Sequence, residues 1–446
     1  MRHTNVFTKF LSLICVLAFG FADAQALLSK EEAILLTLEN NYNIKLTENS
    51  LQTAENNASL YNSGYLPTVF TRGGASYDVK DTETSFQNPN QDRSVEDAES
   101  RNYNASIGVN YVLFNGLGRY YTYAKLKETY NLTELQTRNV MENTLLTLFF
   151  AYYEVARLSE NEVNQRETLE ISKLRLKKAK YGFQYGQSTK LDVLNANVDM
   201  NNDSITFLGV QRELANAKRD LNIVLGRDVN MEVTVNTTVV YTESLQLDTI
   251  LNSSLESNVA YLQTQKALSL SEYDVKINNS TWMPSVSLTS SYAWNKRSND
   301  PTNQFSPIGL TQTGLNAGVS LSWNLFDGGN TTTRVRNAKI AVDTKELEKE
   351  QQLEFLKRDV NNAWESYQNA LFTLKVQKTN VETNRLNFER SEEYYKLGQI
   401  SSIDFRLAQV NLINAELTLS LAKYSAKNAE LLLLQLSGNL LGNKQF

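Results

Sequence analysis

The chain has 446 residues, of which 41% are hydrophobic, so it could bury a sizeable core or form two or three ordinary domains. Its formal net charge of −5 argues against a nucleic-acid partner, because such a partner requires a clustered basic surface. With only 5 prolines and 19 glycines, the sequence favours long, uninterrupted helices.

The N-terminal residues 1–24 have the pattern of a cleaved secretory signal peptide. Positive residues precede an apolar stretch from Phe10 to Phe21, and Ala22-Asp23-Ala24 supplies an A-x-A cleavage site. Cleavage would remove Cys15 and His3, the only cysteine and the only histidine. We therefore expect no disulfide and no thiolate or imidazole metal site. An enzyme could still use carboxylates alone, but no paired acids recur in a plausible cleft, so we expect no cofactor and no enzymatic activity. No later stretch is apolar enough for a transmembrane helix.

The mature chain contains an internal duplication. Leu66-Pro67-Thr68-Val69 recurs as Met283-Pro284-Ser285-Val286 after 217 residues, and Gly186-Gln187-Ser188 recurs as Gly398-Gln399-Ile400 after 212 residues. The smaller second offset indicates a longer hairpin loop in the first copy. The predicted domains are a first repeat, an equatorial connection with a short strand, a second repeat and a C-terminal tail, over 25–226, 227–245, 246–438 and 439–446.

Each repeat begins with a helix and two strands. The predicted strands fall at about 66–79 and 103–114 in the first repeat and at about 284–294 and 314–326 in the second, with outward-facing polar loops over 80–102 and 295–313. Side chains alternate along the second strand of each pair, so that Tyr103 and Ile107 share one face and Asn104 and Ser106 the other.

Two features of these strands favour a membrane barrel over a soluble sheet with one wet face. The polar face is small and uncharged, as the lining of a water-filled lumen could be. Aromatic residues also lie near strand ends, as in the interfacial girdles of outer-membrane barrels. These aromatic residues are Tyr65, Tyr77, Trp282, Trp294, Trp323 and Phe326.

Four strands cannot close a barrel by themselves. Every backbone donor and acceptor must be paired in lipid, so an open sheet edge is prohibited there. If the strands are in a membrane, several chains must therefore contribute strands to one barrel. This argument predicts an oligomer and does not give the number of subunits.

A very long helix follows each strand pair. The predicted helices, about 117–182 and 330–396, contain no proline and would each be about 100 Å long. The returning helices carry apolar residues at a 3-4 spacing with asparagine interruptions, typical of coiled-coil-like seams. An ordinary antiparallel coiled coil is an alternative explanation of these seams. In the first repeat the seam residues are Leu191, Leu194, Val198, Ile205 and Leu208.

A tip turn joins the long helix to the returning helix in each repeat, over 183–190 and 397–402. Glycine supplies the left-handed residue that ends one helix, and serine or threonine can cap the next. Asp192 and Asp404 then fall in the first turn of the returning helix, where the helix dipole favours a carboxylate. A capping role and a functional role are equally compatible with this position.

The whole mature chain resembles the TolC-like outer-membrane efflux proteins. The resemblance is carried by the duplication, the L-P-x-V start at Leu66, the L-F-[ND]-G motifs at Leu113 and Leu325, and the Y-x-x-G-x-x-x-x-x-D turn from Tyr395 to Asp404. It implies an α+β membrane protein of the outer membrane of a Gram-negative bacterium. In such a homotrimer, four antiparallel strands per chain form a 12-stranded β-barrel, and the helices form a long antiparallel α-helical barrel in the periplasm.

The resemblance also implies a function and partners. The chain would be the passive exit duct of a tripartite efflux or type I secretion system, embedded in outer-membrane lipid. It would receive small molecules or exported substrates from a periplasmic adaptor protein and an inner-membrane pump of the RND or ABC type. The alternative is a periplasmic or surface coiled-coil scaffold without channel activity.

The family's tip residues carry over to this chain only in part. Asp192, Asp404 and Tyr395 match the periplasmic gate positions. Leu407 stands where the family has a second aspartate, and Ile400 where it has a latch arginine. The candidate adaptor-docking residues at the tips are Gly186, Gln187, Ser188, Thr189, Gly398, Gln399, Ile400 and Ser401.

Overall fold

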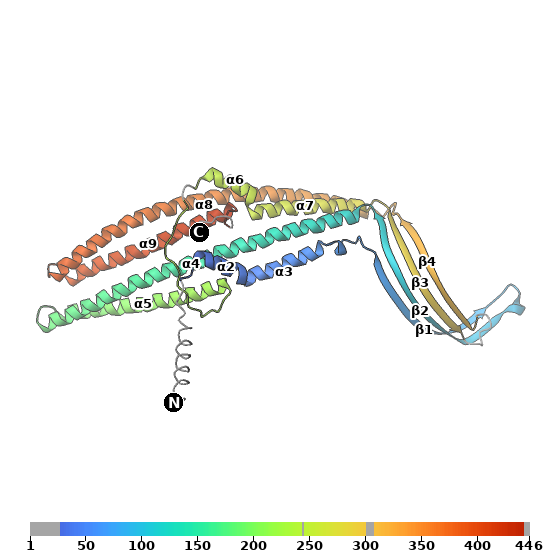
Figure 1. Cartoon of the computed structure of the whole chain (residues 1–446), viewed down its shortest axis with the longest axis horizontal. Helices are drawn as coiled ribbons and strands as arrows, with labels where there is room; N and C mark the ends of the chain where they lie inside the picture. Colours follow the sequence, from blue (N-terminus) through green and yellow to red (C-terminus); the bar gives the residue numbers. More distant parts are fainter. Residues whose placement is uncertain (1–26, 243–244, 300–306, 441–446) are drawn as a thin grey trace, which may run out of the picture. The chain divides into compact units, whose positions relative to one another are not determined.

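The computed structural model describes residues 27–242, 245–299 and 307–440 (Figure 1). The predicted signal peptide over 1–24 and residues 441–446 of the predicted tail lie outside these residues. The first repeat contains α2 (Lys30–Asn40), α3 (Tyr42–Asn57), β1 (Thr68–Thr84), β2 (Arg93–Asn115), α4 (Gly118–Gln184) and α5 (Lys190–Leu225). The second repeat contains α6 (Leu247–Ser257), α7 (Val259–Ser280), β3 (Ser285–Asn299), β4 (Gly309–Ser322), α8 (Asn330–Lys396) and α9 (Ser402–Leu436). None of the helices in the described ranges is long and apolar enough to cross a membrane.

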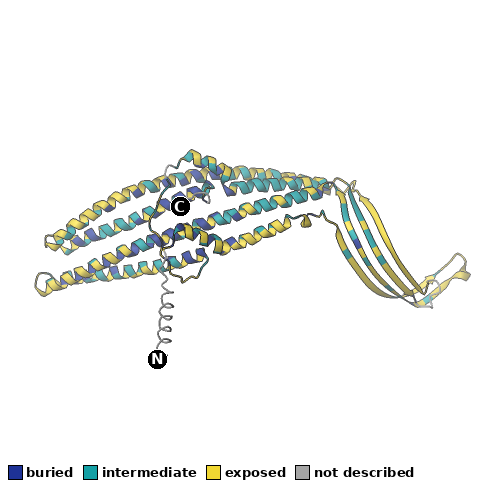
Figure 2. Ribbon diagram, in the orientation of Figure 1, coloured by how far each residue is buried: buried dark blue, intermediate teal, exposed yellow. Residues whose placement is uncertain are grey.

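The strands form one antiparallel sheet with the order β1-β2-β3-β4. Ile107 pairs with Thr71 and Tyr292, and Tyr292 pairs with Leu315, so these side chains lie in one row across the sheet. The next row contains Ser106 and its partners. The register therefore confirms the predicted alternation. Exposed and half-buried residues prevail along all four strands (Figure 2), and the apolar residues Ile107 and Leu315 are 56% and 71% exposed.

The predicted strand bounds were wrong at both ends of the sheet. Much of the segment 80–102 is strand, because backbone pairing continues through polar residues as far as Thr84 and Arg93. In the second repeat β3 likewise continues to Asn299, and β4 begins at Gly309. At the other end, β4 stops at Ser322 and not at 326. Its partner Ser285 is the first residue of β3, and the preceding Pro284 has no N–H to donate.

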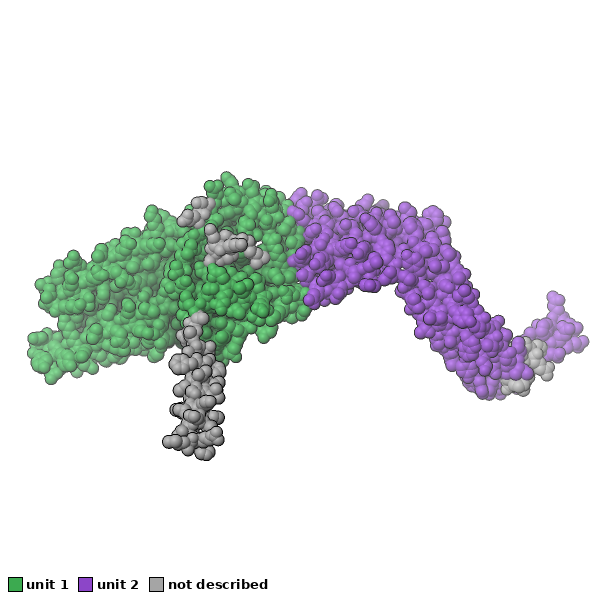
Figure 3. All heavy atoms as spheres, viewed as in Figure 1, with its two compact units in different colours: residues 1–49, 135–262, 351–446 green, residues 50–134, 263–350 purple. Residues whose placement is uncertain are grey.

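The chain divides into two compact units that do not coincide with the repeats (Figure 3). One comprises residues 1–49, 135–262 and 351–446, and the other comprises 50–134 and 263–350. Each unit thus combines segments from both repeats. The second unit contains the sheet and the helices next to it.

In the unit that contains the sheet, the turn between β2 and α4 is tightly packed. Gly116 has a φ of +65°, and a Cβ at this position would lie 2.3 Å from the carbonyl oxygen of Ser280. The L-F-N-G motif therefore requires its glycine both for the left-handed conformation and for the close approach. Farther along, ion pairs between Lys125 and Asp274 (2.6 Å) and between Lys266 and Glu128 (3.1 Å) join α4 to α7.

In the other unit, the core lies around the middle of α4. Phe149, Tyr152 and Tyr153 are almost completely buried against residues of α5 and α9. The Tyr152 hydroxyl donates to the Leu28 carbonyl oxygen (2.8 Å) and accepts from the Asn236 backbone N–H (3.0 Å). These contacts hold the connection between the repeats. Among its described residues the only bridge joins Val235 to Leu28, so the predicted short strand is absent there. Side chains bond part of this backbone instead, as where the Asn222 amide donates to the carbonyl oxygens of Val229 and Met231.

The duplication is visible in tertiary contacts. The side-chain amide of Asn41 donates to the Val224 carbonyl oxygen (2.8 Å), and that of Asn258 donates to the Leu436 carbonyl oxygen (3.1 Å). In both repeats, the end of the short first helix is thus tied to the end of the returning helix.

Candidate functional site at the hairpin tips

The helices α4 and α5 form a first hairpin, and α8 and α9 form a second. Their turns have the same local structure. Gly186 and Gly398 have φ values of 74° and 73°, which confirms the predicted left-handed residue in each turn. The residue after each glycine donates its backbone N–H to a carbonyl of the last helical turn, Gln187 to Gly182 (2.7 Å) and Gln399 to Tyr394 (2.8 Å).

Each tip aspartate belongs to a capping box. The Asp192 carboxylate accepts from the backbone N–H of Thr189 (2.8 Å) and from its hydroxyl (2.7 Å), and the Asp192 N–H donates to that hydroxyl (3.1 Å). Asp404 makes the same three contacts with Ser401. The bonds from Thr189 hold the pKa of Asp192 below its usual range. Both carboxylates therefore have a local role at a helix N-terminus.

Tyr395 contacts residues of both hairpins. Its ring stacks on Phe405 with a centroid distance of 4.8 Å and an interplanar angle of 7°. Lys178 of the first hairpin lies over the Tyr395 ring, with its Nζ 3.9 Å from the ring centroid, and donates to the Tyr395 carbonyl oxygen (2.9 Å). At the corresponding place in the first hairpin, Phe183 is approached by Lys190 of the same hairpin (5.6 Å). The two tips are thus similar in backbone and different in side-chain contacts.

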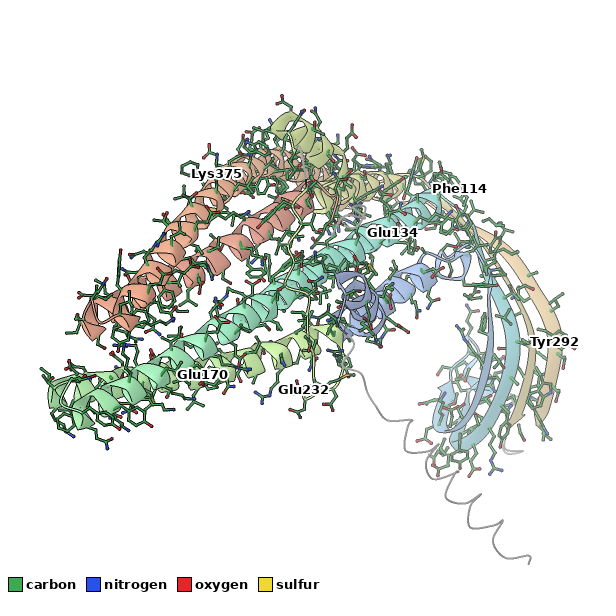
Figure 4. All side chains as sticks on the ribbon, turned by 60° about the vertical axis from the view of Figure 1, so that its left-hand side comes forward. Phe114, Glu134, Glu170, Glu232, Tyr292 and Lys375 are labelled. Carbon is green, nitrogen blue, oxygen red and sulfur yellow. The ribbon has the colours of Figure 1, made fainter. Side chains whose placement is uncertain are left out.

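A groove of about 770 Å³ lies between the two tips. Five of the predicted docking residues line it, and the remaining docking candidates lie in the same two turns. The docking residues on the groove are Gln187, Ser188, Gly398, Ile400 and Ser401, and further lining comes from Lys177, Lys178, Tyr181, Tyr185, Asp192 and Tyr395. Figure 4 shows the side chains along both hairpins, with Glu170 marking the first and Lys375 the second.

An ionic network joins the hairpins farther from the turns, and the sequence analysis missed it. Arg406 of α9 makes two hydrogen bonds to the Asp203 carboxylate of α5, Nη1 to Oδ2 (2.7 Å) and Nη2 to Oδ1 (2.8 Å). Ser172 of α4 donates to the same carboxylate (2.5 Å). Bidentate pairing of this kind is the strongest geometry that an arginine and a carboxylate can form.

A second arginine extends the network. Arg175 of α4 pairs with Asp199 of α5 (3.1 Å) and donates to both the carbonyl oxygen and the hydroxyl of Ser402 (3.1 Å each). Gln409 of α9 donates to the Thr168 carbonyl oxygen (3.1 Å). The Arg175 side chain is only 4% exposed, and burial lowers its pKa.

Repeat comparison could not find the network, because its charges are not duplicated. At the 212-residue offset, Arg175, Asp199 and Asp203 correspond to neutral residues of the second repeat, and Arg406 corresponds to a leucine of the first. The uncharged counterparts are Asn387, Asn411, Ala415 and Leu194. The sequence does contain one signal that could have indicated the network: each of these positions is charged in one repeat and uncharged in the other.

The predicted interface aromatics occur at three levels of the sheet, since Trp294 pairs with Ala105 of β2 and Tyr77 pairs with Arg101, four residues farther from the helices. Trp282, Trp323 and Phe326 lie at the end where the strands meet the helices, together with Tyr65, and the Trp323 indole N–H donates to the Trp282 carbonyl oxygen (3.0 Å). Tyr77 and Trp294 lie within β1 and β3, farther along the sheet, and are 56% and 37% exposed.

Two long helical hairpins combined with a four-stranded antiparallel sheet, in a duplicated chain, define the fold of TolC-like channel proteins. The chain belongs to the outer membrane efflux protein family, which matches residues 33–227 and 250–439. This result confirms the resemblance seen in the sequence and places the chain in the outer membrane.

Individual relatives agree with this assignment. The outer membrane efflux protein BepC of Brucella suis is 20% identical over 412 residues, covering 92% of this chain and 85% of BepC. The outer membrane protein TolC of Vibrio cholerae is 23% identical over 306 residues, covering 67% of this chain and 68% of TolC. The outer membrane channel CmeC of Campylobacter jejuni has a TM-score of 0.77 at 17% identity, covering 92% of this chain and 86% of CmeC. VceC of Vibrio cholerae has a TM-score of 0.72 at 15% identity, covering 92% and 96%.

Proposed function

We propose that three copies of this chain form the outer-membrane exit duct of an efflux or type I secretion system. The observation that carries the proposal is the sheet, which has one exposed apolar face, one polar face and two edges. In the order β1-β2-β3-β4, the outer edges of β1 and β4 have no partner strand among the described residues. In lipid these edges must be paired, and strands of neighbouring copies would pair them.

The height of the apolar face supports a membrane position. Nine residues separate Ser285, at the helix end of β3, from Trp294 at the second aromatic level. At about 3.3 Å per residue this is about 30 Å along the strand, or about 23 Å across the bilayer for a strand tilted by about 40°. The apolar band of outer-membrane barrels is about 25 Å tall.

The helices also require neighbours. The predicted seam residues of α5 stay exposed in the single chain, with Leu191 at 63% and Ile205 at 69%. In α9, Ile403 and Leu407 are 65% and 61% exposed. Burial of such seams against the same helices of adjacent copies would build a closed helical barrel around a tunnel.

The hairpin tips are the proposed periplasmic entrance. Tip turns 186–189 and 398–401 would contact a periplasmic adaptor, and an inner-membrane pump of the RND or ABC type would supply the energy. Asp192, Asp404 and Tyr395 are the proposed gate residues at this entrance. The chain itself would conduct its cargo passively.

Purification and reconstitution of the mature protein test the proposal. We expect a detergent-dependent trimer in multi-angle light scattering and discrete conducting units in planar bilayers. A monomer that stays soluble without detergent would contradict the duct and favour a coiled-coil scaffold.

A further inference from the structure

We infer that Arg72 and Arg297, on the polar face of the sheet, favour the passage of small anions through the outer-membrane part of the duct. The inference rests on the proposed duct, in which the polar face lines the lumen. It names the chemical class of solute that this lining selects, and it concerns the sheet alone.

The first observation is the distribution of charge on the polar face. From the row of Thr68 to the row of Ser76, the charged side chains on this face are Arg72 of β1 and Arg297 of β3. The polar face of β2 is uncharged over these rows, as predicted. A carboxylate, that of Asp78, follows only in the next row. This stretch of the face therefore carries positive charge alone.

The second observation is that the position of Arg72 is defined by its neighbours. Its guanidinium carbon lies 4.6 Å from the centroid of the Phe70 ring, which is within the range of a cation–π contact. The Phe70 ring lies against Gly108, its partner on β2, where a Cβ would be only 2.6 Å from the ring. Gly108 thus makes room for the ring that supports Arg72.

Neither arginine is neutralised by a carboxylate. The ion pairs of the described strand residues lie farther from the helices, at Asp78 and at Arg101, and include neither Arg72 nor Arg297. Both arginine residues are also exposed. Since an aromatic ring supports a cation without removing its charge, Arg72 presents a full positive charge on this face.

Comparison of the repeats shows that the supporting residues change together with Arg72. The first repeat has the aromatic residue, the arginine and the glycine, whereas the second repeat has small polar residues at the corresponding positions. These counterparts of Phe70, Arg72 and Gly108 are Ser287, Thr289 and Ser320. The two serines are cross-strand partners, like Phe70 and Gly108. The three residues therefore form a set that occurs in one repeat only.

In a barrel of three copies, each arginine would occur three times at one level of the lumen. Rings of arginine or lysine are the devices by which pores select anions. The Debye length is about 30 Å at 0.01 M salt and about 3 Å at 1 M. The effect of the rings should therefore be large at low salt and disappear at about 1 M.

Reversal potentials of single channels in a gradient of KCl test the inference. At low salt, we expect Arg72→Gln and Arg297→Gln each to lower the chloride-to-potassium permeability ratio at least about twofold, the effect of one unit charge at about 8 Å in water. Arg72→Lys keeps the charge and should keep the ratio. Arg72→Glu should lower the ratio further than Arg72→Gln.

Arg101→Gln is the matched control. Arg101 of β2 lies next to Asn102, the partner of Arg297, but belongs to the opposite face of the sheet. Its guanidinium also lies over an aromatic ring, that of Tyr77 (5.6 Å). Because this variant loses the same charge outside the proposed lumen, its permeability ratio should equal that of the wild type. Light scattering checks that every variant forms trimers.

The outcomes separate the two proposals. Conducting pores with the wild-type ratio in both Arg72→Gln and Arg297→Gln would overturn the inference and leave the duct intact. A lower unfolding temperature of Arg72→Gln with an unchanged ratio would reduce the contact with Phe70 to a structural one. If correctly assembled wild type and variants all fail to conduct, the duct is overturned, and the inference with it.

Discussion

At the scale of single residues, Asp404 has a capping role in the structure and a gate role in the proposed function. Asp404 completes the capping box with Ser401, and its carboxylate is exposed at the start of α9. An exposed carboxylate can cap a helix and also project charge into a tunnel. These two roles respond differently to substitution of Asp404 and of its capping partner.

Asp404→Ala removes both the charge and half of the capping box, whereas Ser401→Ala disrupts the box and keeps the charge. We expect both variants to lose about 1 kcal/mol of helix stability. Only Asp404→Ala should raise single-channel conductance in planar bilayers or antibiotic leakage in cells. Unchanged conductance in Asp404→Ala would assign this residue to capping alone.

Asp192 gives a pH dependence whose sign follows from its lowered pKa. The unfolded chain has an Asp pKa of about 3.9, so the cap contributes its full stability above that pH and loses it as the pH falls through the folded pKa. In thermal unfolding followed by circular dichroism, the difference between wild type and Asp192→Ala should shrink below about pH 4. A difference independent of pH would show that the carboxylate charge is not involved.

At the scale of elements, adjacent residues of one strand lie on opposite faces of the sheet. Ile107 lies in the apolar row with Thr71 and Tyr292, and Ser106 lies in the polar row with Arg72. Figure 4 labels Tyr292 on the apolar row. If the apolar face contacts lipid, a charge at Ile107 must enter hydrocarbon, and a charge at Ser106 must enter water.

Ile107→Arg should therefore destabilise the membrane-inserted protein by about 2–4 kcal/mol. Ser106→Arg, one residue away in the same strand, should cost little. Urea unfolding in lipid vesicles measures both values. Equal costs for the two variants would contradict the assignment of the faces.

At the scale of the whole molecule, the single chain leaves two kinds of surface incomplete, the sheet edges and the apolar seams of the returning helices. Phe149 and Tyr152 show that α4 buries its middle within the chain. Ile205, on the neighbouring α5, stays exposed. In the proposed duct, additional copies would satisfy both kinds of surface at once, and one chain would contribute only part of the barrel.

Ile205→Asp should weaken trimer formation, because it places a charge in a seam that another copy would cover. Thr206→Asp, the next residue of α5 and also exposed, should assemble like the wild type. Light scattering in detergent over a range of protein concentrations measures the change. Equal assembly of the two variants would exclude this seam as an interface.

The sequence alone determined the duplication, the order of the strands and long helices, the alternation in β2 and the glycines of the turns. These properties are local, because periodicity and backbone conformation leave a direct trace in neighbouring residues. Each repeat begins with two short helices, where the sequence predicted one. The strand ends were misjudged, since polar residues such as Lys80 pair through their backbone regardless of side chain. Membership of the family was predicted from motifs that recur in both repeats at nearly constant spacing.

Only the tertiary structure revealed the network of Arg175, Asp199, Asp203 and Arg406. Its members are separated by up to 231 residues in sequence and occupy three helices. Each is an ordinary charged residue at its own position, and no local pattern distinguishes it from a solvent-exposed one. The fold brings the four together in a partly buried contact between the hairpins, where an unpaired charge would be unfavourable.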